Sequence, residues 1–261
     1  FLQHEKGWDN MLTKTRQKEI LKLLENRGSV TLQELKDHLN TSESTIRRDL
    51  NTLDAQGKLI KVFGGAVAAD NMSIRDEQVS RREEKNLEEK RLIARYAASL
   101  IQDDDFVYLD AGTTTGCMLD YISDATTAVF VTNAPSHAQK LARKGMEVIL
   151  IGGRLKQSTE AVVGEEACRQ IEKFNFSLGF LGSNGVSERS GFSTPDQDEA
   201  MVKKRAIERI HRCFVLCDHT KFYKVSPISF AKLEDAVVLT DSAPQGNFQE
   251  MPNIVEISED E

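Results

Sequence analysis

The fold of the N-terminal part is decided by the stretch SESTIRRDLNTLDAQGKLIKVFGGAV, residues 42–67. Ile46, Leu50 and Leu53 recur at helical spacing and predict a helix whose apolar side faces inward. Ser42 stands where it can cap the N-terminus of that helix, and a glycine at position 57 ends it. The apolar runs on either side of the paired glycines at 64–65 predict a two-stranded hairpin. The stretch therefore predicts a helix followed by a wing.

Two helical patterns precede this stretch. TRQKEILKLLENRG (residues 15–28) carries an apolar stripe and ends at a glycine. In TLQELKDHLN (residues 31–40), Thr31 can cap the helix, and Glu34 stands at the position of a capping box. The connection from this helix to the next one is short, which is typical of a helix-turn-helix.

The outer side of the third helix carries groups that suit DNA. An arginine can fork onto guanine or phosphate in a major groove, and hydroxyl groups can donate to phosphates. The alternative is a solvated helix face, in which the two adjacent arginines pair with Glu43 or Asp49. Three helices followed by a wing favour DNA binding. The residues predicted to contact double-stranded operator DNA are Thr31, Ser42, Ser44, Thr45, Arg47, Arg48, Asn51, Lys58 and Lys61.

The distribution of charge supports a division into two parts. The 261-residue chain has a net charge of -7, yet residues 11–69 hold ten Lys/Arg against seven Asp/Glu. The chain thus has a basic N-terminal part, residues 11–69, called the head, and an acidic remainder, called the body. This is the pattern expected when only the head contacts a polyanion. The length suffices for one large domain or for two smaller ones with cores of their own.

The sequence also bears on location. Its longest apolar runs are far shorter than the roughly 20 residues of a membrane helix, and the opening residues do not resemble a secretory signal. Met11 looks like a natural start, so residues 1–10 are expected to be an upstream extension or a cloning remnant. Cys213 and Cys217 lie in an apolar run, which favours core packing over metal or disulfide chemistry. We therefore expect a cytoplasmic protein that contacts no membrane.

Beyond the head, the pattern changes to alternating strands and helices. Residues 70–90 are charged and nearly free of apolar side chains, which predicts a linker leading into a helix. Residues 91–261 hold six apolar strand patterns separated by helical ones. Strands that are apolar on both faces imply a mostly parallel α/β sheet.

In such sheets, ligands collect at the carboxyl ends of the strands. The turn Asp110-AGTTT-Gly116 offers backbone N–H groups and hydroxyls, which bind a phosphate or carboxylate, unless it is only a tight turn. No GK[ST] follows it, so it is not a Walker A loop. Polar and cationic groups at the other strand ends favour a polyhydroxylated anion, such as a sugar phosphate, over a nucleotide. These strand-end candidates are Asp110, Gly112, Thr113, Thr114, Thr115, Thr132, Asn133, Gly153, Arg154, Gly182, Ser183, Asn184, Asp218 and Lys221.

Both parts resemble the DeoR family of bacterial transcriptional regulators. The head matches its winged helix-turn-helix at TIRRDL (45–50) and FGGA (63–66), and the body matches its effector domain at LDAGTTT, VTNA, GGR, GSNG, GFSTPDQDEAMVK and DHTKF. The resemblance implies a body related in fold to ribose-5-phosphate isomerase, with the threonines 113–115 holding a phosphate. It also implies that Glu199 and Lys203 line the sugar pocket, although VKKR leaves open whether Lys203 or Lys204 points inward.

This kinship leaves a second hypothesis, a sugar-phosphate isomerase or deaminase with a DNA-binding head. The isomerases carry a D-G-A-D-E cluster after the strand that resembles FSLGFLGSNGV, whereas this chain has Ser183-Asn184. Without those carboxylates the pocket is poorly equipped for proton transfer, so we predict a receptor without catalytic activity or metal. A third hypothesis, an architectural DNA-binding protein, has no use for a phosphate pocket.

The mechanism expected is a repressor of a carbohydrate operon that leaves DNA when a phosphorylated sugar binds. A head of modest charge needs the avidity of a homo-oligomer, a dimer or tetramer, to bind specifically. NTSESTIRRDL is similar to the recognition helix of fructose-operon repressors in this family, which suggests fructose 1-phosphate as the effector. A recognition helix reads DNA, however, and activation in place of repression stays open.

Overall fold

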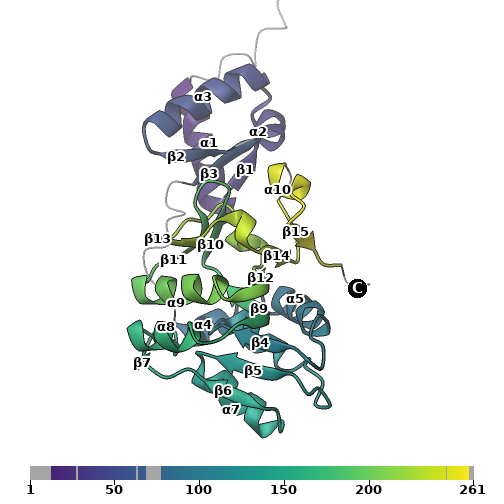
Figure 1. Ribbon diagram of the computed structural model, residues 1–261. Helices are drawn as coiled ribbons and strands as arrows, with labels where there is room; N and C mark the ends of the chain where they lie inside the picture. The colour runs from purple at the N-terminus through teal and green to yellow at the C-terminus, as the bar shows by residue number, and fades with distance from the viewer. Residues whose placement is uncertain (1–12, 28, 63, 69–77, 245, 259–261) are drawn as a thin grey trace, which may run out of the picture. The chain divides into compact units, whose positions relative to one another are not determined.

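The computed structural model describes residues 13–27, 29–62, 64–68, 78–244 and 246–258. The chain separates into two compact units, residues 1–72 and residues 73–261 (Figure 1). The region proposed as an extension, residues 1–10, lies outside the described residues.

The first unit is a winged helix-turn-helix. Its helices are α1 (Thr13–Arg27), α2 (Leu32–Leu39) and α3 (Glu43–Ala55). The predicted wing is present as β2 (Leu59–Val62) and β3 (Gly65–Ala68), which pair antiparallel. A third strand, β1 (Ser29–Thr31), pairs with β3 and was not predicted from the sequence, because three residues are too few to show an alternating pattern.

The predicted inward face of α3 is confirmed. Ile46, Leu50 and Leu53 are at most 1% exposed and pack against apolar residues of α1 and α2. The hydroxyl of Ser42 accepts a hydrogen bond from the backbone N–H of Thr45 at 3.3 Å, so Ser42 caps α3 as expected.

The two adjacent glycines of the wing, Gly64 and Gly65, are required for different reasons. Gly64 has a φ of +79°, a left-handed conformation that favours glycine. Gly65 lies so close to β1 that a Cβ would stand 2.1 Å from the carbonyl oxygen of Val30. A side chain at position 65 would therefore push β1 off the sheet.

The second unit is built on a seven-stranded parallel sheet in the order β15-β14-β12-β9-β4-β5-β6, which confirms the predicted fold class. The strands are β4 (Phe106–Leu109), β5 (Val129–Thr132), β6 (Val148–Leu150), β9 (Phe176–Gly182), β12 (Ile210–Leu216), β14 (Val237–Thr240) and β15 (Ile254–Glu256). Along β4, Tyr108 faces one side of the sheet, while Val107 and Leu109 face the other.

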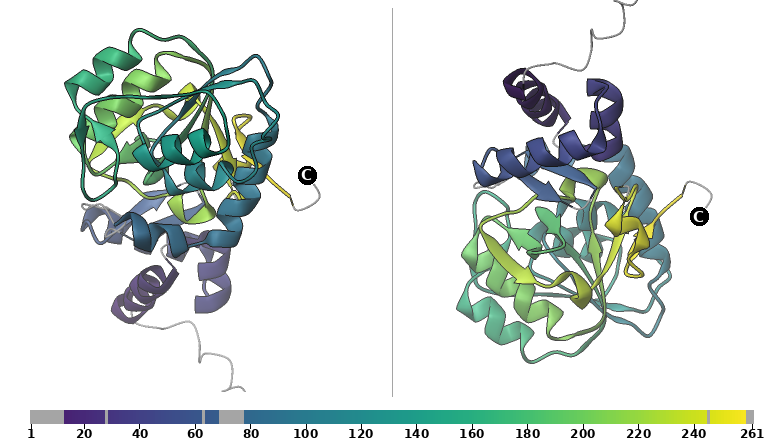
Figure 2. Two further views of the ribbon diagram at one scale, coloured as in Figure 1. Left: turned by 90° about the horizontal axis from the view of Figure 1, so that it is seen from below. Right: turned by 90° about the horizontal axis from the view of Figure 1, so that it is seen from above.

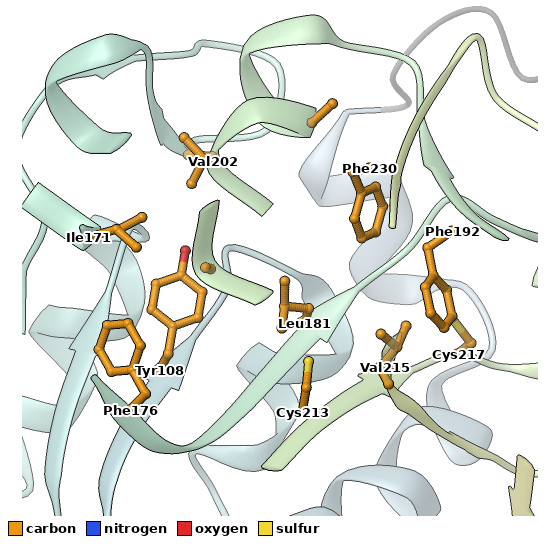
Figure 3. Close-up of a cluster of buried hydrophobic side chains, with 14 of the residues drawn as sticks. Tyr108, Ile171, Phe176, Leu181, Phe192, Val202, Cys213, Val215, Cys217 and Phe230 are labelled. Atoms are coloured by element: carbon orange, nitrogen blue, oxygen red, sulfur yellow. The ribbon is translucent and has the colours of Figure 1, made fainter. Parts of the chain in front are cut away.

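Helices cover both faces of this sheet (Figure 2). One face carries α5 (Leu87–Ser99), α6 (Thr113–Met118) and α7 (Pro135–Arg143); the other carries α8 (Glu165–Ile171) and α9 (Gln197–Ile207). Figure 3 shows the core beneath α8 and α9, where Tyr108, Phe176 and Leu181 of the sheet meet Ile171 and Val202.

A small antiparallel sheet packs beside α9. Its strands are β10 (Gly185–Ser187), β11 (Gly191–Thr194) and β13 (Ile228–Ala231). The remaining short elements are the hairpin β7 (Arg154–Leu155) and β8 (Val162–Val163), and α10 (Asn247–Glu250).

The predicted linker over residues 70–90 needs correction. Residues 70–77 lie outside the described residues, but α4 (Val79–Glu84) and the start of α5 are helical parts of the second unit. The backbone N–H of Val79 donates to the carbonyl of Ser158 at 3.3 Å, which ties α4 to the loop between β7 and β8. The sequence resembled a linker because α4 buries no residue in a core, so its pattern lacks the apolar stripe of a packed helix.

The cysteines pack as expected. Cys117, Cys168, Cys213 and Cys217 are all free. Burial raises the pKa of both Cys213 and Cys217 to about 12, so neither is a reactive thiolate at neutral pH.

Among the described residues, no helix is long and apolar enough to cross a membrane.

Candidate functional site

The candidate DNA-contacting residues that belong to α3 fall on one exposed side of that helix. Ser44, Arg48 and Asn51 are exposed, and within the described part of the chain Arg48 has no side-chain partner. Arg47 pairs with Glu43 at 2.7 Å, so the solvated-face alternative describes this arginine in the free protein. Both side chains are more than half exposed, and such a pair contributes only about 0–1 kcal/mol. A phosphate can therefore displace Glu43 at little cost.

Several predicted DNA contacts also have structural roles. The Ser42 hydroxyl lies within 3.0 Å of the hydroxyls of both Ser44 and Thr45. The Thr31 hydroxyl accepts from the backbone N–H of Glu34 at 3.1 Å and caps α2. The remaining candidates are Lys58, Lys61 and Asn51. Lys61 lies in the wing, and its ammonium donates to the Asn51 amide oxygen at 2.7 Å. Lys58 directly precedes the wing and is exposed.

Asp49 was not predicted to be part of the core. Its carboxylate is 2% exposed and accepts from the guanidinium of Arg16 and from Gln17 at 3.2 Å, which fixes α3 on α1. Position 49 is three residues from Ile46, so helical spacing alone places it on the inward face. The charge of the residue obscured this signal.

A cavity lies in the second unit where β4, β9 and β12 end. The strands β5 and β9 flank β4 on opposite sides, so this is the point where strand order switches and where ligands bind in open α/β sheets. The residues that line the cavity are Arg82, Lys85, Lys90, Ala111, Gly112, Thr113, Thr114, Gly182, Ser183, Asn184, Glu199, Lys203, Leu216, Asp218 and Lys221.

The cavity has a surplus of positive charge. Five cationic side chains line it, against the two carboxylates of Glu199 and Asp218. Asp110, just behind the wall, pairs with Lys203. The cations of the wall thus outnumber the carboxylates, an arrangement that suits an anionic ligand such as a phosphate monoester, whose charge is about -2.

The choice between Lys203 and Lys204 is settled by the geometry. Lys203 is 7% exposed, and its ammonium donates to the Asp110 carboxylate and to the Gly182 carbonyl at 3.0 Å, whereas Lys204 is exposed. Asp110 in turn accepts from the backbone N–H of Gly182 at 3.0 Å. Asp110 therefore joins β4 to β9 behind the cavity and does not line it.

The two acidic groups of the wall are held differently. Burial alone would raise the pKa of Asp218, but the nearby Lys221 ammonium and hydrogen bonds from Thr220 and Asn86 lower it below its ordinary value. Asp218 is therefore ionised at neutral pH. Glu199 accepts from the Thr159 hydroxyl and from the Lys156 ammonium at 3.2 Å.

The threonines of the loop after β4 divide into two groups. Thr115 is fully buried, and its hydroxyl donates to the Asp110 and Gly112 carbonyls, so it shapes the turn. Thr113 and Thr114 line the cavity, and within the described residues their hydroxyls have no hydrogen-bond partner. They are the threonines available to a ligand.

Four further predicted residues do not line the cavity. Asn133 accepts from the backbone N–H of Ala111 at 3.0 Å, and Thr132 accepts from that of Ala134 at 3.1 Å, so both support the loop from β5. Gly153 and Arg154 are exposed, and Arg154 pairs with Asp198. They were included because they follow a strand, but the chain turns away from the cavity into the β7–β8 hairpin at this point.

Sequence reasoning missed three cations of the wall: Arg82, Lys85 and Lys90. They lie in the stretch that was interpreted as a linker. The available signal was that Lys90 occupies the inward face of α5, three residues before the buried Ile93.

Comparisons with known proteins agree with both units. Residues 16–72 match the family described as the DeoR-like helix-turn-helix domain, and residues 85–242 match the DeoR C terminal sensor domain. An uncharacterised HTH-type transcriptional regulator FruR of Bacillus subtilis is 40% identical over 92% of this chain and 96% of its own length. A lactose phosphotransferase system repressor of Staphylococcus aureus is 33% identical over 92% and 96%.

Among solved structures, a ribose 5-phosphate isomerase A of Methanocaldococcus jannaschii matches with a TM-score of 0.41 and 14% identity, over 54% of this chain and 56% of that one.

Proposed function

The chain belongs to the DeoR family of transcriptional regulators, and from that premise we propose that a sugar phosphate, held in the cavity of the second unit, releases the first unit from operator DNA. The protein is a sugar-responsive DNA-binding regulator, since its relatives are named as regulators and repressors.

The observation that carries the proposal is the excess of cationic side chains over carboxylates in the cavity wall, beside the hydroxyls of Thr113 and Thr114. A phosphate dianion is attracted by this excess of positive charge, and the two hydroxyls can donate to its oxygens. The first N–H groups of a helix lack acceptors within the helix, and here they belong to the same two threonines. Glu199 and Asn184 offer acceptors and a donor to the hydroxyls of a sugar.

The alternative, a retained isomerase or deaminase activity, needs a carboxylate that is free to take a proton. Both carboxylates of the wall are engaged: Glu199 by Thr159 and Lys156, and Asp218 by Thr220 and Asn86. Ser183 donates to the backbone carbonyl of Gly185 at 2.7 Å and shapes the turn. These contacts favour binding without turnover.

We infer a homo-oligomer that acts as a repressor. A single head contacts only a short half-site, and linking two heads raises the effective concentration of the second one. Fructose 1-phosphate is the first effector to test, because the recognition helix is similar to those of fructose-operon repressors.

A thermal-shift panel of sugar phosphates against the full chain tests the proposal. A ligand at 100 times its Kd adds about 2.7 kcal/mol to the free energy of unfolding if it binds only the folded protein. The same ligand should release operator DNA in a gel-shift assay, and the double variant Thr113→Ala/Thr114→Ala should bind operator normally yet fail to respond. If no phosphorylated sugar stabilises the protein, the architectural hypothesis is favoured instead.

A further inference from the structure

Lys90 is a buried cation without a carboxylate partner. It is 4% exposed and lines the cavity, and within the described residues its ammonium forms no ion pair. The acceptor that it has is neutral, the backbone carbonyl of Arg82. Burial lowers the pKa of Lys90 in spite of the negative charge of Asp218, so the folded protein incompletely compensates this charge.

Arg82 is the second group with unused capacity. It lines the same cavity, and its Nε atom is buried without a hydrogen-bond partner among the described residues. A buried donor without an acceptor is costly, and an anion in the cavity is the kind of group that satisfies it. One anion in the cavity can therefore accept from both cations.

The two residues belong to helices that are held very differently. Lys90 lies on α5, whose Ile93, Ala94 and Ala97 are fully buried against the sheet. Arg82 lies on α4, which buries no residue; α4 packs against α6, and the bond from Val79 to Ser158 and the Lys90 ammonium on the Arg82 carbonyl also hold it. A helix with so few buried contacts opens at low free-energy cost.

We propose that Lys90 and Arg82 bind the phosphate of the effector together and that the phosphate thereby fastens α4 onto α5. This rests on the proposed function, because it assumes an anionic effector in the cavity. In the sequence, α4 is the first helix after residues 69–77, which connect the two units. If the effector binds more tightly when α4 is docked on α5, its binding raises the population of the docked state. Release from DNA requires such a difference in effector affinity between two states of the protein.

The test uses the full chain and inorganic phosphate as the probe, against chloride at equal ionic strength. The variants are Lys90→Met and Arg82→Gln, and the matched control is Arg81→Gln, which changes an exposed arginine on the same helix. Thermal shifts report binding of phosphate, and hydrogen–deuterium exchange of residues 79–84 reports the docking of α4.

In the unchanged protein, phosphate should raise the Tm and slow exchange across α4. Arg82→Gln and Lys90→Met should lose most of both effects, whereas Arg81→Gln should keep them. Without phosphate, Lys90→Met should have an unchanged or higher Tm, because relief of the desolvation of a buried charge outweighs the loss of the one bond to the Arg82 carbonyl, although that loss should speed exchange across α4. A purely structural lysine would give the opposite result, a lower Tm with the phosphate response intact.

The outcomes are distinguishable. If phosphate stabilises the unchanged protein but the variants respond equally, or if exchange across α4 does not change, this inference is wrong while the phosphate pocket stands. If phosphate has no effect on the unchanged protein, the proposed pocket fails and the inference fails with it.

Discussion

Replacing Lys203 by methionine tests how the floor of the cavity is built. The change leaves the Asp110 carboxylate buried without its cation, since the two side chains are 3% and 9% exposed. Breaking a buried ion pair on one side costs about 3–5 kcal/mol, because an uncompensated charge is left behind. For a domain of the size of the second unit, each kcal/mol lowers Tm by roughly 2–4 °C, so we expect a loss of roughly 6–20 °C.

The assay is thermal unfolding of the full chain followed by far-UV circular dichroism. Lys204→Met is the matched control, because Lys204 is exposed and adjacent on α9, and it should change the free energy of unfolding by no more than about 0.5 kcal/mol. The double variant Asp110→Asn/Lys203→Met removes both charges. Its loss in the free energy of unfolding should be far smaller than the sum of the losses in the two single variants.

Two results would refute this reasoning. If Lys203→Met costs no more than Lys204→Met, the pair does not hold β4 to β9 and α9. If the double variant shows the full sum of the two single losses, the two groups do not interact.

Three further predictions concern the head and the core. Arg48→Ala should weaken operator binding by about 1–3 kcal/mol in a gel shift, and Arg91→Ala, an exposed arginine of the second unit, should not; equal affinities would remove α3 as the recognition helix. Ser42→Ala should lower the stability of the first unit by about 0.5–2 kcal/mol through loss of the α3 cap, and an unchanged melting curve would contradict that role. Burial lowers the pKa of His137 from 6.5 to about 4, so the unfolded chain takes up a proton first and stability falls as the pH drops from 6.5 toward 4. Between pH 7 and pH 5 this loss amounts to about 2 kcal/mol, and it should be absent in His137→Gln and present in the exposed control His211→Gln when Tm is compared at the two pH values.

Much of the first unit was predictable because its signals are local. Helical spacing placed Ile46, Leu50 and Leu53 in the core, and Ser42 was correctly predicted as a cap. The parallel sheet was predictable for the same kind of reason, since strands that are buried on both faces are apolar throughout. The strand β1 was missed because it is too short for a pattern, and the buried Asp49 was missed because its charge obscured its place on the inward face; its partner Arg16 lies 33 residues away.

The site was only partly predictable. Strand ends indicated Thr113, Asn184 and Asp218 correctly as residues of the cavity wall, because parallel strands bring their carboxyl ends to one edge of the sheet. The same rule included Arg154 wrongly, since it does not show which way the chain turns after a strand.

By itself, the sequence was enough to predict the two folds, the helix proposed to read DNA and the strand ends that line the cavity, because all of these follow from periodicity and from the order of the elements. Only the tertiary structure decided which charges meet: Lys203 and not Lys204 in contact with Asp110, and Arg82 and Lys90 in the wall of the cavity. A charged side chain looks the same in a sequence whether it lies in water or in a cavity. Its energy depends on burial and on partners that are distant along the chain, and these are set when the chain folds.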